Sequence, residues 1–201
     1  MTTDKRILVA ITGASGSIFA EHLILQLLNC TSRVYLVVSD TGRTVVPYEL
    51  PSSSPLNQML KGTYTGPNAD KLRVFANDDF YAPVASGSSA PDAMVITPCS
   101  MGTLARVRAG VSQTLIERAA DVVMKESRLL VCCPRESPLS ILHLENMLDL
   151  ARMGVRMLPL APAFYQHPKT LEDLVDFMTG KVLETLGIKH ELYKPWSERR
   201  C

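Results

Sequence analysis

Three clusters of polar and glycine residues, each placed directly after an apolar run, carry the candidate chemistry of this 201-residue chain. They are TGASGS at residues 12–17, PCSMGT at 98–103 and PRESPL at 134–139. Ligands of open α/β sheets bind just beyond the carboxyl ends of the strands. We therefore expect the three clusters to converge on one crevice, and we expect the chain to be an enzyme.

The first cluster suits the binding of a phosphate group. Gly13 and Gly16 allow a tight turn and a close approach of the backbone, while Ser15, Ser17 and the free N–H groups of a following helix can hold an anion. A plain strand-to-helix turn with a serine cap uses the same residue types. The motif is not G-x-G-x-x-G, so it does not choose between FMN, NAD and a sugar phosphate.

The other two clusters add hydroxyl and charged groups to the same expected crevice. Ser100 and Thr103 lie at the predicted start of another helix and suit a second anion site. Cys99 has no base near it in the sequence, so a buried small residue is the favoured interpretation over a nucleophile. Arg135 and Glu136 place a cation and a carboxylate after an apolar strand, with a solvated ion pair as the alternative.

Composition excludes several other classes of protein. The 21 Lys and Arg residues balance 20 Asp and Glu residues, so no net field favours nucleic acid or an anionic membrane. The five apolar residues 7–11 are too few for a signal peptide, and no stretch approaches the ~20 residues of a membrane helix. The five cysteines lack paired metal-ligand spacing, so we expect neither a metal site nor a disulfide framework. We expect one cytoplasmic domain over residues 1–201, with a tail from about residue 187.

Apolar runs and helical stripes alternate along most of the chain. The predicted strands are 7–11, 33–39, 72–75, 93–97, 129–133 and 156–160, and the predicted helices are 17–28, 101–109, 113–125, 139–153 and 171–186. Prolines, glycines and serines between Pro47 and Ser89 predict loops, with weak helical content near residues 56–60. Apolar strands separated by helices predict a three-layer, Rossmann-like or flavodoxin-like α/β fold with a central parallel sheet.

Seven short segments resemble the UbiX family of flavin prenyltransferases in order and spacing, from about residue 6 to residue 186. They are TGASG at 12–16, SGS at 86–88, PCS-x-x-T at 98–103, RAADV at 118–122, KE at 125–126, RE-x-PL at 135–139 and PAFY at 162–165. The resemblance implies that dimethylallyl phosphate alkylates reduced FMN at N5 and then C6, without a metal. It implies that the product, prenylated FMN, serves a UbiD-type decarboxylase. It also implies a homododecamer with flavin sites between subunits.

The resemblance also assigns roles to individual residues of this chain. The residues expected to bind FMN are Gly13, Ala14, Ser15, Ser39, Ser100, Met101, Gly102, Thr103, Arg118 and Arg135. Those expected around the prenyl donor are Gly87, Lys125, Arg135, Tyr165 and Lys181. The expected catalytic residues are Ser15, Glu49, Lys125, Glu136 and Trp196. Among these, Glu136 would handle the proton during ring closure, and Glu49 and Trp196 would help to close the site.

Two positions depart from the family pattern. Lys181 replaces a common arginine, which keeps the charge but loses the two-pronged geometry, and Gly102 replaces a frequent lysine. Two alternative functions are compatible with the same fold. Flavin-dependent cysteine decarboxylases carry Pro-x-x-Ala-Asn-Thr where this chain has PCSMGT, and the missing asparagine disfavours them. A non-catalytic flavin carrier would leave Lys125, Glu136 and Tyr165 without a chemical role.

Overall fold

The computed structural model describes residues 3–194, which fold around one parallel sheet. The sheet has six strands in the order β3-β2-β1-β4-β5-β6. The strands are β1 (Arg6–Ile11), β2 (Arg33–Val38), β3 (Leu72–Phe75), β4 (Ala93–Cys99), β5 (Leu129–Pro134) and β6 (Arg156–Met157). All five neighbouring pairs are parallel, which confirms the predicted fold class.

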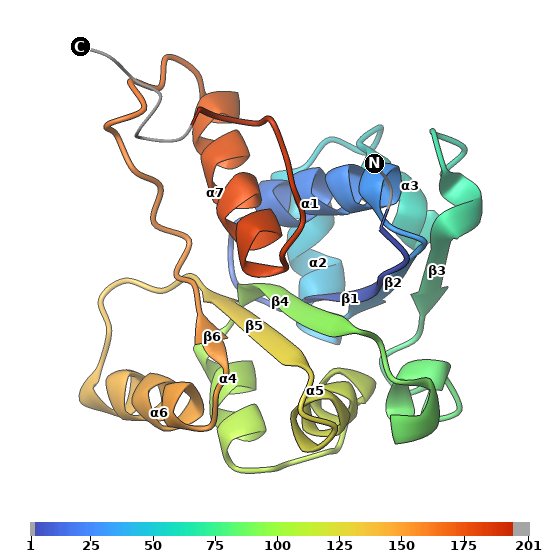
Figure 1. Ribbon diagram of the computed structural model, residues 1–201, viewed down its shortest axis with the longest axis vertical. Coiled ribbons are helices and arrows are strands. Elements are labelled where there is room, and N and C mark those ends of the chain that lie inside the picture. The colour runs from blue at the N-terminus through green and yellow to red at the C-terminus, as the bar shows by residue number, and fades with distance from the viewer. Residues whose placement is uncertain (1–2, 195–201) are drawn as a thin grey trace.

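Helices cover both faces of this sheet (Figure 1). One face carries α1 (Ser17–Cys30), α2 (Asp40–Glu49), α3 (Pro55–Lys61) and α7 (Leu171–Thr185). The other carries α4 (Met101–Arg108), α5 (Leu115–Lys125) and α6 (Ile141–Arg152). Three short 3-10 turns, η1 (Ala69–Lys71), η2 (Pro83–Ala85) and η3 (Gly87–Ser89), lie in the long connections before β3 and β4. The arrangement is a three-layer α/β sandwich.

The central strands supply side chains to two separate cores. In β1, Ile7, Val9 and Ile11 pack with α1, α2, α3 and α7, whereas Leu8 and Ala10 pack with the helices of the opposite face. All five side chains are fully buried. Burying one such aliphatic side chain stabilises a fold by roughly 1.5–3 kcal/mol. The unbroken apolar runs in the sequence therefore arise because both faces of the sheet are covered.

Two sequence predictions are wrong in this part of the molecule. Residues 40–49 form α2, although the sequence predicts no helix there and a loop from Pro47. The helix forms despite poor helix formers because the Ser39 side chain accepts the N–H of Gly42 at 3.0 Å, and because Val46 is buried in the core. β6 is also shorter than predicted, with only Arg156 and Met157 in the strand.

The described residues also test the expectations about membranes, metals and thiols. Between residues 3 and 194, no helix is long and apolar enough to cross a bilayer. The same residues hold no group of three or more His, Cys, Asp or Glu side chains that could bind a metal ion. Cys99, Cys132 and Cys133 are buried free thiols, and burial raises the pKa of Cys133 to about 12. The burial of Cys99 favours a packing role over a nucleophilic one.

Candidate flavin site

The first two polar clusters are joined directly at the carboxyl edge of the sheet. The N–H and the hydroxyl of Thr12, just after β1, both donate to the carbonyl of Pro98 in β4, at 3.2 and 2.8 Å. In return, the N–H of Ser100 donates to the Thr12 hydroxyl oxygen at 2.7 Å. Thr12 is 1% exposed, so these bonds are shielded from water. They hold the turn after β1 beside the start of α4.

The third cluster joins this edge through Arg135. Its backbone N–H donates to the carbonyl of Cys99 at 3.4 Å, and its guanidinium Nε donates to the carbonyl of Ser15 at 3.2 Å. The expected convergence of the three clusters is therefore confirmed. Glu136 follows with an exposed carboxylate, which accepts the N–H of Ser137 at 3.0 Å. Arg135 thus lies beside the turn that precedes α1, and Glu136 follows Arg135 at the end of β5.

Glu49, the last residue of α2, binds the first turn of α1. Its Oε2 accepts the N–H of Gly16 at 3.0 Å and that of Ser17 at 2.8 Å. Burial raises the pKa of Glu49, but hydrogen bonds from the Ser15 side chain and from these N–H groups outweigh it and leave the pKa lowered. The sequence predicts that this turn binds a phosphate, but its N–H groups at Gly16 and Ser17 bind a different anion. The anion in this structure is a carboxylate of the same chain.

Gly13 and Ser39 position α2 beside the same turn. A Cβ atom on Gly13 would lie 2.5 Å from Thr41 Cγ2 and 2.8 Å from Thr41 Cβ, so only glycine fits there without a shift of α2. Ser39 caps α2, and its own N–H donates to the carbonyl of Ile11 at 2.9 Å. Gly13 follows β1 and Ser39 follows β2, so both lie at the carboxyl edge of the sheet, where the sequence predicts flavin contacts.

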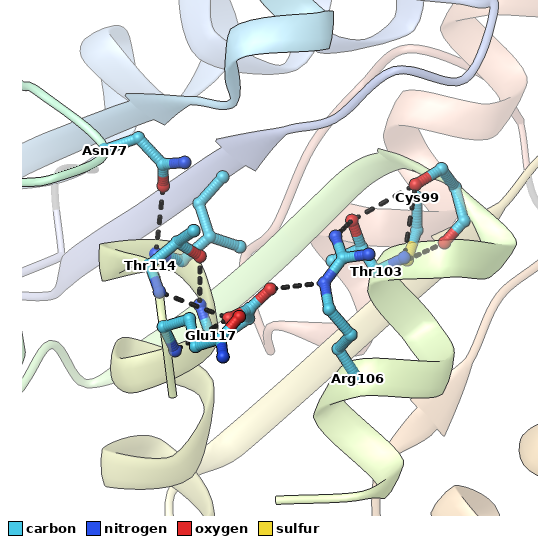
Figure 2. A network of polar contacts seen from close by, with 9 residues as sticks. Asn77, Cys99, Thr103, Arg106, Thr114 and Glu117 are labelled. Carbon is cyan, nitrogen blue, oxygen red and sulfur yellow. Dashed lines mark hydrogen bonds and ion pairs between the residues drawn. The ribbon is translucent and has the colours of Figure 1, made fainter. Parts of the chain in front are cut away.

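A polar network that sequence reasoning missed joins Thr103 and Arg106 of α4 to Glu117 of α5 (Figure 2). Ser100 Oγ accepts the N–H of Thr103 at 3.3 Å and contacts Thr103 Oγ1 at 3.1 Å. Arg106 donates to Thr103 Oγ1 at 3.2 Å and to the carboxylate of Glu117. Glu117 is 2% exposed and also accepts the N–H groups of Gln113 and Thr114. Its capping box with Thr114 was the available signal in the sequence.

Lys125 and Gly87 lie at the opposite edge of the sheet. Lys125 ends α5, shortly before β5 begins, and donates to Glu126 at 2.6 Å. A Cβ atom on Gly87 would lie 3.0 Å from Lys125 Nζ. The structure therefore does not bring Lys125 and Gly87 together with Arg135 within one chain, because α5 returns to the amino edge before β5 starts.

Arg118 lies near the start of α5, at the other end of that helix from Lys125. It lies one turn after the start of α5, donates to the carbonyl of Ala85 at 3.1 Å and pairs with Asp121 at 3.1 Å. These contacts hold α5 against η2. The contact of Arg118 with FMN stays a prediction.

Lys181 lies on α7, and Tyr165 packs against the same helix. The ring of Tyr165 meets the ring of Phe177 edge-on, with centroids 5.8 Å apart. Phe177 and Lys181 are four residues apart on the helix and so share a face. Lys181 Nζ donates to Glu184 at 2.6 Å. Trp196, expected to help close the site, lies outside the described residues.

Comparisons with known proteins identify the family to which this chain belongs. The Flavoprotein family model matches residues 1–183. The flavin prenyltransferase UbiX of Pseudomonas aeruginosa is 45% identical over 203 residues, covering 99% of this chain and 97% of that relative. The chain therefore belongs to the flavoproteins and, within them, to the UbiX-type flavin prenyltransferase family. The resemblance seen in the sequence is confirmed.

Two solved structures are similar over nearly the whole chain. The dodecameric FMN-dependent UbiX-like decarboxylase of Escherichia coli O157:H7 is 39% identical, with a TM-score of 0.85 and coverage of 95% of this chain and 98% of that one. AnUbiX (PadA1), solved with FMN and dimethylallyl pyrophosphate, is 36% identical, with a TM-score of 0.86 and coverage of 98% and 100%. The fold and its connections are thus shared with flavin-binding proteins.

Proposed function

We propose that this chain is a flavin prenyltransferase that transfers the dimethylallyl group of dimethylallyl phosphate to N5 and C6 of reduced FMN. Family membership over nearly the whole chain supports the reaction class. The observation that carries the assignment of the site is the meeting of Ser15, Glu49 and Arg135 at the carboxyl edge. This edge is where open α/β sheets bind their ligands.

The residues at this edge fit FMN. The first N–H groups of a helix have no acceptor within it, and at α4 they belong to Met101 and Gly102. Since Glu49 already holds the first N–H groups of α1, we propose that the start of α4 binds the FMN phosphate. The backbone from Gly13 to Ser15, together with Ser39, would then contact the rest of the flavin.

The chain's own charges suit the transfer step. Reduced FMN, when bound, supplies the nucleophilic N5 and C6 atoms. Arg135 is a fixed cation beside Ser15, and a fixed cation stabilises a departing phosphate. Glu136 is exposed at the same edge and would take the proton that ring closure releases. The lowered pKa of Glu49 keeps its carboxylate ionised and bound to α1.

We further propose that copies of this chain share their sites in a homododecamer. Lys125 and Gly87 lie at the amino edge, whereas Arg135 lies at the carboxyl edge, so one chain does not join them. The 39% identical protein from E. coli O157:H7 is described as dodecameric, which supports an assembly of this kind. Lys125 and Gly87 of one copy would then complete the donor site of another.

We propose that the product is prenylated FMN and that a decarboxylase uses it. Prenylated FMN would pass to a UbiD-type decarboxylase in the cytoplasm, as the resemblance implies. The test is mass analysis of the flavin after anaerobic incubation with reduced FMN and dimethylallyl phosphate, with dimethylallyl pyrophosphate in a parallel sample. A flavin enlarged by one dimethylallyl unit is expected from the monophosphate. An unchanged flavin that stays bound would indicate a carrier instead.

A further inference from the structure

Glu184 on α7 joins a candidate donor-binding cation to the segment that follows the helix. Its Oε2 accepts Lys181 Nζ at 2.6 Å, and its Oε1 accepts the phenol O–H of Tyr193. Nε2 of His190 lies 3.6 Å from the same Oε1. One carboxylate therefore contacts Lys181 on one side and two residues of the segment 187–194 on the other.

The protonation states of this group favour the contact. Burial raises the pKa of Glu184, but the hydrogen bonds from Lys181 and Tyr193 outweigh it, and the pKa is lowered. Burial and donation to Glu184 raise the pKa of Tyr193. Nδ1 of His190 accepts the N–H of Leu192 at 3.2 Å, which leaves Nε2 to face Glu184. A carboxylate and a protonated phenol thus persist together across the neutral pH range.

A glycine inside α7 makes room for the segment. A Cβ atom on Gly180 would lie 2.4 Å from Tyr193 Cε1 and 2.6 Å from His190 Cε1. Glycine lowers the stability of a helix interior relative to alanine, so its presence at this point needs a packing reason. The close approach of Tyr193 and His190 is such a reason. It is independent of the polar contacts of Glu184.

The same segment also reaches Tyr165, a donor-binding candidate that lies before α7 and packs against it. The Tyr193 ring lies 5.1 Å from the Phe177 ring, centroid to centroid, and Phe177 in turn meets Tyr165 at 5.8 Å. Gln166 also donates to the carbonyl of Lys194 at 3.3 Å. Tyr165 and Lys181 are therefore attached to one connected unit, in which Tyr193 is central.

We propose that Glu184 is a positioning residue for the prenyl donor, because it fixes the ammonium of Lys181 and ties it to the segment 187–194. The inference rests on the proposed function, in which Lys181 and Tyr165 contact the donor phosphate. A lysine ammonium has three donors, so one can remain on Glu184 while the others bind a phosphate. An arginine guanidinium would bind the phosphate with two parallel N–H donors, whereas the ammonium of a lysine needs a neighbouring group to orient it.

The test measures donor KM, kcat and FMN affinity for single and double variants. Lys181→Ala should raise donor KM by about ten- to a hundredfold and leave FMN affinity unchanged, and Lys181→Arg should be tolerated. Glu184→Gln should raise donor KM by about three- to tenfold with kcat nearly unchanged. In the Lys181→Ala background, Glu184→Gln should add no further rise. Glu191→Gln, an equal charge change on the same segment, is the control and should keep the parent KM.

The pKa of the Tyr193 phenol reports its hydrogen bond to Glu184 directly. Ultraviolet titration of the tyrosines, with Tyr193→Phe as the blank, isolates the Tyr193 phenol, whose pKa should fall in Glu184→Gln. If Lys181→Ala raises the donor KM but Glu184→Gln keeps the parent KM, the proposed role of Glu184 is overturned, whereas the assignment of Lys181 to the donor site stands. An equal further rise in the Lys181→Ala background would overturn the role of Glu184 too, since Glu184 would then act without Lys181. Lys181→Ala with a parent KM would contradict the donor-site assignment instead.

Discussion

The carboxylate of Glu49 accepts the backbone N–H of Ser17 at 2.8 Å, so the end of α2 binds the beginning of α1. The N-terminus of a helix attracts negative charge, and this carboxylate provides it from within the chain. The contact fixes the turn at residues 13–16, whose Ser15 carbonyl also receives Arg135. The turn at residues 13–16 therefore connects two features: the carboxylate bound at the start of α1 and the position of the Arg135 guanidinium.

Replacing Glu49 should cost stability in a pH-dependent way. Because the pKa of Glu49 is lowered in the folded chain, its contribution is present above the ordinary glutamate range and is lost as the pH falls through the lowered value. We expect Glu49→Gln to reduce the free energy of unfolding by about 0.5–1 kcal/mol at pH 7. Urea unfolding at several pH values measures this, with Glu145→Gln on exposed α6 as the control. A difference that persists unchanged below pH ~3 would contradict the assignment.

Gly13→Ala should destabilise the fold by overpacking. The new methyl group would meet Thr41 at 2.5 Å, and such insertions typically cost about 1–3 kcal/mol. Thr41→Gly removes the clashing atoms, so the double variant should regain part of the loss. Thermal unfolding of the two single variants and the double variant measures the coupling. Strictly additive losses would show that the close approach of Gly13 to Thr41 is not what requires glycine.

Glu136→Gln should keep FMN bound but lose most of the prenylated product. The amide has the same size as the carboxylate but cannot take a proton, and general-base catalysis contributes about 10²–10⁴-fold. Single-turnover assays under anaerobic conditions, with flavin content measured in parallel, give both quantities. Product formation at the parent rate would rule out a proton-transfer role for Glu136.

Shared sites should allow two inactive variants to complement each other. Lys125→Ala and Arg135→Ala change residues at opposite edges of the chain, so a mixed assembly can contain sites in which both residues are intact. We expect each pure variant to have low activity and the mixture, after dissociation and reassembly, to regain part of the parent activity. A mixture as inactive as its components would contradict a site shared between copies.

The sequence predicted most of the sheet because both-sided burial leaves long apolar runs, as in β1 and β4. Helix α2 was missed because its residues favour other structures, and the Ser39 cap, the burial of Val46 and the bonds of Glu49 to α1 stabilise it. The capping boxes at Thr114 and Ser140 mark where α5 and α6 begin. These caps could have corrected the predicted starts by two residues.

The sequence predicted which residues meet at the carboxyl edge of the sheet, because strand ends can be located from the apolar runs. Residues that follow strands directly, such as Thr12, Ser100 and Arg135, meet because parallel strands end at one edge. The pairing of Arg106 with Glu117 joins two helices, and no local pattern reveals its partner. The position of Lys125 was foreseeable, since a residue just before a predicted strand lies at the amino edge.

The most direct measurement of the central claim is the mass of the flavin recovered after anaerobic incubation of the protein with reduced FMN and dimethylallyl phosphate. A flavin enlarged by one dimethylallyl unit in the parent protein, and mostly unmodified FMN in Glu136→Gln, is the result we predict. Unmodified FMN in the parent protein, bound at full occupancy and with the donor unconsumed, would contradict the assignment of prenyl transfer to this chain.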